Sequence, residues 1–146
     1  MSLVKKITVA DTYSVRQEVL RKGKPIETCH FDGDYLDTTN HFGIFNNEDL
    51  IGVVSVYKTN TILFSEKTQF QIRGMAVLEN FQGKGFGEQL LKVAEDFCWE
   101  EKAAVIWFNA REKAVSFYRK SGYETIGDAF DIPDVGTHFV MFKKIK

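Results

Sequence analysis

Three glycines within five residues stand where a strand-like segment gives way to a helical one. The stretch QGKGFG, residues 82–87, follows the alternating segment 69–77 and precedes an apolar period of 3.6 residues. Glycine at a helical site costs about 0.5–1 kcal/mol relative to alanine. A helix start, however, carries about four unpaired N–H groups and roughly half a positive charge, and bare backbone lets a phosphate approach them. The stretch therefore predicts an anion site at a strand–helix junction.

Two familiar nucleotide-binding loops do not fit the spacing of these glycines. The P-loop needs Gly-Lys followed by Ser or Thr, whereas Phe86 follows Gly85 here. The dinucleotide pattern G-x-G-x-x-G fails as well, because Gly87 comes one residue too early after Gly83 and Gly85. A nucleotide-dependent enzyme is therefore disfavoured, and such an enzyme would have to show ATP binding.

Hydrophobic periodicity predicts a mixed α/β sheet in a single domain over residues 1–146. Asp11 is the expected cap of the first helix, and in 69–77 strict alternation places Phe70, Ile72 and Ala76 on one face. The expected order is β-α-β-β-β-α-β-α-β-β, with strands at 5–8, 41–46, 50–57, 69–77, 104–108, 123–127 and 137–145, helices at 11–20, 83–102 and 111–122, and loops at 27–40 and 128–136.

The glycine stretch resembles the Q/R-x-x-G-x-G/A motif of the GNAT acyl-CoA N-acyltransferases, with Gln82, Gly85 and Gly87 at the defined positions. Downstream, WFNAREKAVSFYRKSGYE resembles the second signature of that family, a strand ending in Asn followed by A-x-x-F-Y-x-x-x-G-F/Y. The element order matches from about Ile7 to Ile145. The resemblance implies a mixed, mostly antiparallel sheet with a central β-α-β acyl-CoA-binding core. It also implies N-acetyl transfer from acetyl-CoA to a primary amine by direct attack.

The same resemblance implies which residues hold the acetyl donor. Backbone N–H groups of 82–87 would hold the CoA pyrophosphate, and the strand end at 75–77 would hydrogen-bond the pantetheine arm. Gly74 fits a β-bulge there, and the N–H of Val77 or a neighbour would polarise the thioester carbonyl. The implied acetyl-CoA contacts are Met75, Ala76, Val77, Gln82, Gly83, Lys84, Gly85, Phe86, Gly87, Asn109, Arg111 and Tyr118.

Tyr118 matches the tyrosine that protonates the departing CoA sulfur in this family. A phenol of pKa about 10 is mostly protonated at neutral pH and can serve a thiolate whose conjugate acid has a pKa of about 8.5. Plainer interpretations stand beside these roles: Tyr118 as a helix residue next to core Phe117, Asn109 as a helix cap, and Arg111 as a solvent-facing charge. No cysteine is placed as a covalent acyl carrier.

The sequence does not define the group that deprotonates the amine. Some family members use a glutamate on the strand before the glycine turn, where this chain has Gln71 and Arg73. A water relay is one alternative, and further base candidates lie elsewhere, at Asp34, His41 and His138. Arg73 is instead a candidate to bind an acidic group of the acceptor. The substrate-binding candidates are Asp34, Arg73 and His138, with the loop 27–40 as a candidate wall.

Composition and charge argue against nucleic-acid, membrane and metal partners. A net charge of −1 gives no electrostatic reason to expect a nucleic-acid partner. No apolar run reaches the ~18 residues of a membrane helix and no secretory leader is visible, so no membrane partner and a cytoplasmic location are expected. Two cysteines and three histidines lack metal-ligand spacing, so no metal is expected. A non-catalytic acyl-CoA sensor of the same fold is the alternative to an enzyme, and a homodimer is compatible with the resemblance.

Overall fold

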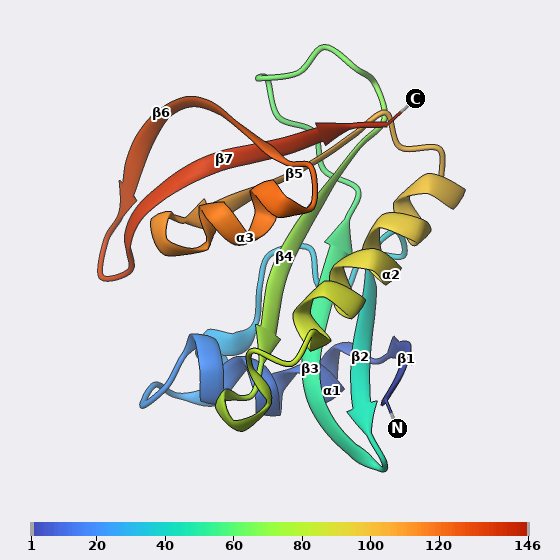
Figure 1. Cartoon of the computed structure of the whole chain (residues 1–146), viewed down its shortest axis with the longest axis vertical. Coiled ribbons are helices and arrows are strands. Elements are labelled where there is room, and N and C mark those ends of the chain that lie inside the picture. Colours follow the sequence, from blue (N-terminus) through green and yellow to red (C-terminus); the bar gives the residue numbers. More distant parts are fainter. Residues whose placement is uncertain (1, 146) are drawn as a thin grey trace.

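A seven-stranded sheet runs through the protein in a computed structural model that describes residues 2–145 (Figure 1). The strand order is β1-β2-β3-β4-β5-β7-β6, and every neighbouring pair is antiparallel except β4 with β5. The predicted mixed, mostly antiparallel sheet is therefore confirmed. The strands are β1 (Ser2–Ile7), β2 (Asn40–Asn46), β3 (Asp49–Tyr57), β4 (Gln69–Val77), β5 (Val105–Arg111), β6 (Glu124–Ile132) and β7 (Gly136–Lys144).

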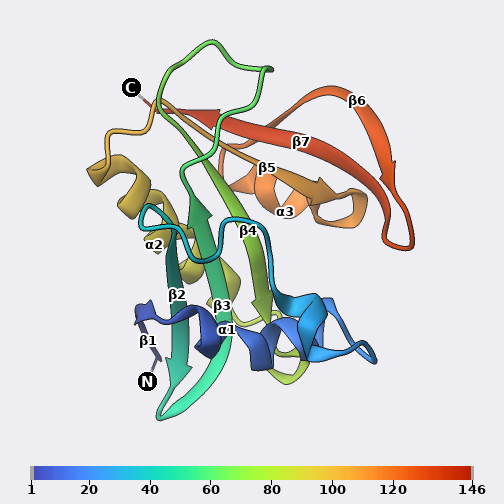
Figure 2. The same cartoon turned by 180° about the vertical axis from the view of Figure 1, so that it is seen from behind.

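Helices cover both faces of this sheet. Figure 1 shows α2 (Phe86–Glu100) and α3 (Val115–Lys120) in front of the sheet, and Figure 2 shows α1 (Val9–Val15) on the opposite face. The π-helical turn η1 (Arg16–Leu20) continues α1. Short 3-10 turns complete the element set: η2 (Ile26–Cys29), η3 (Glu79–Phe81) and η4 (Glu112–Ala114). The unit β4–α2–β5 is the central crossover that the sequence predicted.

The apolar stripe of α2 supplies the main core. Leu90, Leu91 and Ala94 are buried on that stripe and pack in one cluster with Ile44 of β2 and Val54 of β3. Burying each leucine side chain contributes about 1.5–3 kcal/mol. Because this face repeats at the helical period, the sequence pattern alone predicts it.

A β-bulge interrupts β4 at Gly74. Along the β3–β4 pairing, Val53 faces Ala76 and Ser55 faces Arg73, so two steps on β3 oppose three on β4. Gly74 has φ of 65°, in the left-handed region that glycine adopts most easily. The bulge expected from the sequence is therefore present, and it lies just before the end of the strand.

The bulge reverses the inside–outside alternation of β4. Phe70 and Ile72 belong to the core under α2, whereas Ala76 packs with Val15 of α1 on the other face. The prediction that Phe70, Ile72 and Ala76 share one face is wrong, because one extra residue shifts every later side chain to the opposite side of the sheet.

The two parallel strands β4 and β5 separate after a short stretch of pairing. They pair only where Gln69–Gln71 faces Val105–Trp107, while β5 pairs with β7 along its whole length. The C-terminal halves of β4 and β5 are thus splayed apart. This opening lies at the carboxyl ends of parallel strands, a common place for ligands in α/β sheets.

Two predicted boundaries are wrong for local reasons. The first helix is capped by Thr8, not Asp11: the Thr8 hydroxyl accepts from the Asp11 N–H and the Asp11 carboxylate accepts from the Thr8 N–H, which forms a capping box. The predicted loop 128–136 is largely strand, since β6 continues to Ile132 past an irregularity in its pairing with β7. Its many turn-forming residues concealed an irregular edge strand.

Candidate functional site

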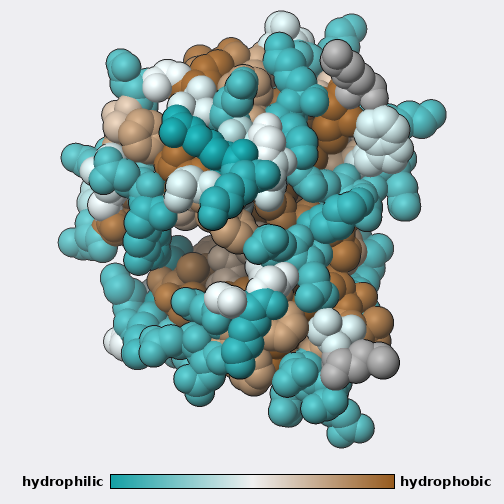
Figure 3. All heavy atoms as spheres, in the orientation of Figure 1, coloured by the Kyte–Doolittle hydropathy of each residue, from teal (hydrophilic) through white to brown (hydrophobic). Residues whose placement is uncertain are grey.

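The splay of β4 and β5 opens into a cleft of about 1060 Å³. Figure 3 shows the surface hollowed between α3 and the glycine turn, with hydrophobic side chains at its floor. The cleft brings together eight of the predicted donor-site residues, namely Met75, Ala76, Val77, Gln82, Gly83, Gly85, Gly87 and Arg111. It also brings in residues that the sequence did not indicate as donor contacts, among them Glu18, Lys22, Phe81, Lys113 and Phe117.

The glycine turn presents open backbone to this cleft. Gly83 and Gly85 have φ of 76° and 86°, and a Cβ added at either would meet no protein atom within 4 Å. Gly85 is the N-cap of α2, and no side chain caps the first turn of the helix. The turn therefore offers the uncapped N–H groups and the positive end of a 15-residue helix to an anion in the cleft.

Side chains around the turn serve the fold more than a ligand. The Gln82 amide donates to the Val77 carbonyl at 2.9 Å and so ties the turn to the end of β4. The Lys84 ammonium lies 5.8 Å from the centre of the Phe81 ring. Phe86 packs against the main core. Lys84 and Phe86 are not among the cleft-lining residues. Any contact of these two residues with acetyl-CoA would therefore involve their backbone N–H groups and not their side chains.

Tyr118 lies on α3, inside an aromatic cluster. Its ring centroid is 4.4 Å from that of Phe108 on β5 and 5.1 Å from that of Phe117, which lines the cleft. Burial raises the pKa of the Tyr118 phenol to about 12, and no charged group contributes to that shift. Tyr118 itself is not among the residues lining the cleft described above. The phenol is thus held in its neutral form near the splayed strands.

A second group of predicted residues gathers on the sheet face opposite α2 and α3. Phe108 and Ala110 belong to the core under α2, so the alternating Asn109 and Arg111 face the other side. His138 pairs directly with Arg111 across β5 and β7, and it therefore shares that face. Asn109 lies within β5 rather than at the start of the following helical turn, so the helix-cap interpretation of Asn109 is wrong.

The tautomer of His138 follows from its surroundings. Its Nδ1 lies 2.8 Å from the Gly136 carbonyl, which can only accept, so Nδ1 carries the proton. The lone pair of a neutral ring then remains on Nε2. His138 is 5% exposed, and its ring packs 5.9 Å from that of Phe130.

Comparison with known proteins agrees with this geometry. The sequence model of the Acetyltransferase (GNAT) family matches residues 9–123. The chain belongs to the GNAT family. A protein of Bacillus subtilis (strain 168), named as the uncharacterized N-acetyltransferase YitI, is 36% identical over 143 residues, which cover 98% of this chain and 96% of that protein.

Solved structures share the GNAT fold at low sequence identity. A putative N-acetyltransferase from Lactobacillus plantarum aligns with a TM-score of 0.79 at 18% identity and covers 98% of this chain and 97% of its own. An aminoglycoside 6′-N-acetyltransferase complexed with coenzyme A aligns with a TM-score of 0.77 at 10% identity, over 97% and 96% of the two chains. Across residues 2–145, no helix is long and apolar enough to cross a membrane, and no group of three or more potential ligands is arranged for a metal ion.

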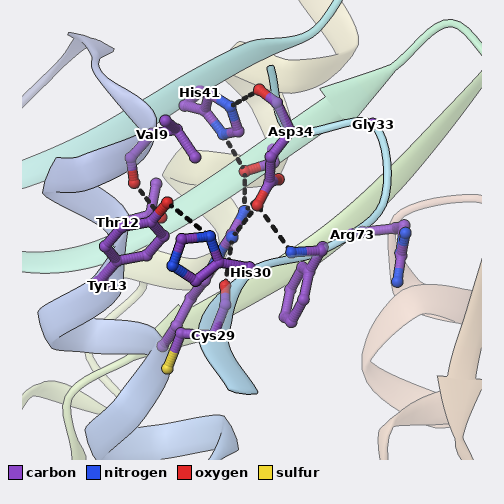
Figure 4. A network of polar contacts seen from close by, with 12 residues as sticks. Val9, Thr12, Tyr13, Cys29, His30, Gly33, Asp34, His41 and Arg73 are labelled. Atoms are coloured by element: carbon purple, nitrogen blue, oxygen red, sulfur yellow. Dashed lines mark hydrogen bonds and ion pairs between the residues drawn. The ribbon is translucent and has the colours of Figure 1, made fainter. Parts of the chain in front are cut away.

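In this GNAT chain Asp34 is part of a buried network rather than an open acceptor site (Figure 4). Arg16 of η1 and Asp34 form a bidentate ion pair with N–O distances of 2.7 and 3.1 Å. The Tyr57 hydroxyl and the Phe31 N–H donate to the same carboxylate. Since both carboxylate oxygens already accept two hydrogen bonds, Asp34 is not available to bind an acceptor or to act as a base.

The network also occupies His41. Its Nε2–H donates to the Asp34 carbonyl at 3.0 Å, and its Nδ1 accepts from the Ser55 hydroxyl at 2.6 Å. Arg16 donates to the Ser55 oxygen as well as to the Cys29 carbonyl. Both ring nitrogens of His41 are therefore engaged in hydrogen bonds, and one of these bonds links β2 to Asp34 in the loop 27–40.

The position of Arg16 in its helical segment is a sequence signal for this network. Arg16 stands four residues after Thr12 and four before Leu20, on the side of the helical segment that includes buried Val15. A charge within a buried stripe needs a partner. Its partner Asp34 lies eighteen positions further along the chain, and no local pattern connects the two residues.

The buried state of His41 predicts a pH-dependent stability. Burial lowers the pKa of His41, and the charge of Arg16 acts in the same direction, while the hydrogen bond to the Asp34 carbonyl opposes them. Below about pH 6.5 the unfolded chain therefore binds a proton that the folded chain resists, and the free energy of unfolding should fall by up to about 1.4 kcal/mol per pH unit.

Urea unfolding followed between about pH 7 and pH 5 measures this slope. His41→Gln removes the titrating ring and should flatten the part of the slope that begins near pH 6.5. A wild-type free energy of unfolding that stays constant over this range would contradict a neutral, buried His41.

Proposed function

We propose that this GNAT protein transfers an acetyl group from acetyl-CoA to a primary amine by direct attack of the amine on the thioester. The observation that carries the proposal is the uncapped glycine turn at the mouth of the cleft between β4 and β5. Backbone N–H groups at Gly83 to Gly87 would bind the CoA pyrophosphate there. The crystal structure of the aminoglycoside acetyltransferase, described as a complex with coenzyme A, supports the choice of donor by its shared fold.

The end of β4 is suited to the pantetheine arm and the thioester. Met75 to Val77 line the cleft, and β5 leaves them unpaired on that side. The Leu78 N–H already donates to the Ile51 carbonyl at 2.8 Å. The thioester carbonyl is therefore proposed to bind at Val77 or a residue before it, where the bulge at Gly74 redirects the backbone.

The proposed reaction needs one proton donor from the protein, to protonate the departing CoA sulfur. The amine lone pair attacks the thioester carbonyl carbon, the C–S bond breaks, and the thiolate leaves with the electron pair of that bond. The Tyr118 phenol donates its proton to the sulfur. The nitrogen, positively charged once its lone pair has formed the C–N bond, loses a proton to a base or a water relay, and a proton from solvent restores the phenol. Among the three base candidates, Asp34 and His41 are engaged in the buried network. His138 is buried too, but no hydrogen bond within residues 2–145 involves its Nε2.

Neither cysteine favours a covalent acyl-enzyme. Burial raises the pKa of the Cys98 thiol to about 12, so it is protonated at neutral pH and is a poor nucleophile. Cys29 is fully buried behind the Arg16–Asp34 pair. Direct attack by the amine therefore needs fewer rearrangements of this structure than a cysteine relay.

Free-thiol release from acetyl-CoA across a panel of amines tests the proposal. Release that depends on an amine, with formation of the N-acetyl product, is the expected result. The alternative function, an acyl-CoA sensor of the same fold, predicts that acetyl-CoA binds with no amine-dependent thiol release.

A bulky residue in the glycine turn should remove the donor site. Gly85→Val places a side chain over the open N–H groups and should weaken CoA binding, measured by calorimetry, by at least about ten-fold, equivalent to 1.4 kcal/mol. Gly127→Val is the matched control, because Gly127 also has a positive φ, of 75°, and an open Cβ position, but lies in β6 away from the cleft. Normal CoA binding by the Gly85 variant would contradict the proposed donor site.

A further inference from the structure

We infer that the acceptor amine also carries an oxyanion group, a carboxylate or a phosphate, and that the side chains of Arg21, Arg73 and Arg111 bind it. The inference rests on the proposed function and names the chemical class of the acceptor. These three arginines are called the arginine cluster below. Arg111 lines the cleft, whereas Arg21 and Arg73 do not line it and lie beside it in the chain, next to the lining residues Leu20 and Lys22 and two residues before Met75.

Two members of the cluster converge on one aromatic ring. The guanidinium carbons of Arg21 and Arg73 each lie 5.1 Å from the centre of the Phe31 ring, and that of Arg16 lies at 4.1 Å. Figure 4 shows the Arg73 side chain beside the buried network and outside its dashed contacts. Three guanidinium groups thus lie near the Phe31 ring: Arg16 is neutralised by Asp34, whereas Arg21 and Arg73 are half-buried.

The positive charges of the cluster have no carboxylate partner within residues 2–145. No ion pair of the described chain includes Arg21, Arg73 or Arg111. Their hydrogen bonds to the protein go to backbone carbonyls: Arg21 donates to Leu20 at 3.0 Å, and Arg73 donates to Asp32 at 3.4 Å. Asp34, the nearby buried carboxylate, is saturated by Arg16, Tyr57 and Phe31.

Like charges held together without counterions repel one another. Burial lowers the pKa of Arg21, and the charges of Arg111, Arg73 and Arg16 act in the same direction. An anion bound among these groups would relieve that repulsion, because guanidinium groups recognise carboxylates and phosphates through paired, charge-assisted hydrogen bonds. Glu18, Glu79 and Glu88 also line the cleft, but no ion pair within residues 2–145 joins them to the cluster, so a neutral amine would leave the three guanidinium charges uncompensated.

The position of the cluster relates it to the acceptor rather than to CoA. Arg73 immediately precedes the bulge at Gly74, whereas the proposed pyrophosphate site begins beyond Val77. Arg111 lines the cleft from the sheet face that it shares with His138. An anion held here would present an amine a few bonds away to a thioester at the end of β4, and the free Nε2 of His138 would lie on the same face.

The test compares pairs of amines that differ only in the oxyanion. The pairs are the standard α-amino acids against their α-carboxamides, and phosphoethanolamine against ethanolamine, with acetyl-CoA as the donor. The anionic member of at least one type of pair should have a kcat/KM at least about ten-fold higher, and which type shows the preference identifies the oxyanion as carboxylate or phosphate. Equal values across all pairs, or a preference for the neutral members, would overturn the inference while leaving acetyl transfer intact.

Arginine variants test the assignment of the side chains. Arg73→Gln and Arg21→Gln should each raise KM for the preferred anionic amine by about 10- to 100-fold, and should leave the neutral partner's KM and the acetyl-CoA affinity unchanged. Arg119→Gln, at an exposed arginine of α3, is the matched control and should change none of these values. If the cluster variants weaken acetyl-CoA binding and leave the amine KM unchanged, the arginines bind CoA and the inference fails.

A binding measurement separates this inference from the proposed function. Calorimetric titration of the same anionic amines into the CoA-saturated protein requires no turnover. Binding that Arg73→Gln abolishes supports the anion site even if no amine releases thiol, in which case only the proposed acetyl transfer fails. No heat of binding from any anionic amine, together with no preference in turnover, overturns the anion site.

Discussion

Tyr118→Phe is expected to lower kcat by about 10²- to 10⁴-fold and to leave the affinity for acetyl-CoA within about two-fold of wild type. The variant keeps the ring that packs on Phe108 and removes only the hydroxyl. Without the proton donor, the thiolate must leave unprotonated or take a proton from water. Steady-state kinetics with acetyl-CoA and the best amine of the panel gives kcat, and calorimetry with CoA gives the affinity.

Tyr123→Phe is the matched control for this experiment. Tyr123 lies in the same aromatic cluster, but its hydroxyl donates to the Glu95 carboxylate at 2.9 Å, so its loss should affect stability and not kcat. An unchanged kcat in Tyr118→Phe would remove Tyr118 from the acid role. Because burial raises the pKa of Tyr118 to about 12, the wild-type kcat should show no loss from this group as pH rises to about 11.

Asp34→Ala is expected to lower the free energy of unfolding by about 3–5 kcal/mol, a large part of the roughly 5–15 kcal/mol typical of a folded domain. Arg16 is completely buried, so removing Asp34 leaves a cationic side chain in the interior without its carboxylate. The Tyr57 hydroxyl and the Phe31 N–H lose their acceptor as well. Urea unfolding at neutral pH measures the change.

An exposed ion pair provides the control for Asp34. The Lys92 Nζ and Asp96 Oδ1 atoms lie 2.6 Å apart on the exposed surface of α2. Asp96→Ala should therefore change the free energy of unfolding by only about 0.3–0.5 kcal/mol. A loss of less than about 1 kcal/mol in Asp34→Ala would contradict the buried ion pair. The double variant Arg16→Met, Asp34→Leu removes both charges and should recover much of the lost stability.

The buried pair of Arg16 and Asp34 also predicts a contribution to stability that is lost in acid. Burial alone would raise the pKa of Asp34, but hydrogen bonds from Arg16, Tyr57 and the Phe31 N–H outweigh it and hold the pKa below its ordinary value. The stabilisation is therefore fully present at neutral pH. The loss begins near pH 4, where Asp34 of the unfolded chain takes up a proton. It continues as pH falls through the lower pKa that Asp34 has in the folded state.

Local patterns predicted the elements that repeat along the chain. The helical period after Gly87 marked the buried face of α2, and the segment 69–77 is the strand β4 with the bounds expected. The glycine spacing at 82–87 led to the turn that lines the cleft, because positive φ and an open helix start are properties of a few consecutive residues. Such features depend on short-range sterics, so the sequence displays them directly.

Interactions between distant segments limited the prediction of the site. Asp34 looked like an acceptor contact because its loop has no regular pattern, yet Arg16 from another element neutralises it in the interior. Ala76 lies on the face opposite to the expected one because the extra residue at Gly74 shifts the phase of the strand after it. Gly74 indicates a bulge, but the strict alternation used to place Ala76 leaves out this shift. The partner of Asp34 does not follow from spacing at all, since it depends on which segment packs against which.

The sequence by itself determined the mixed α/β fold, the glycine turn before α2, and the tyrosine on α3, because consecutive residues set backbone conformation and helical phase. Only the tertiary structure decided that Asp34 belongs to the interior, that Arg21 after η1 and Arg73 of β4 meet at the Phe31 ring, and that Arg111 of β5 lines the cleft. The reason is electrostatic and geometric. The segments that pack around a charged side chain decide whether it has a counterion, and those segments lie far apart in the chain.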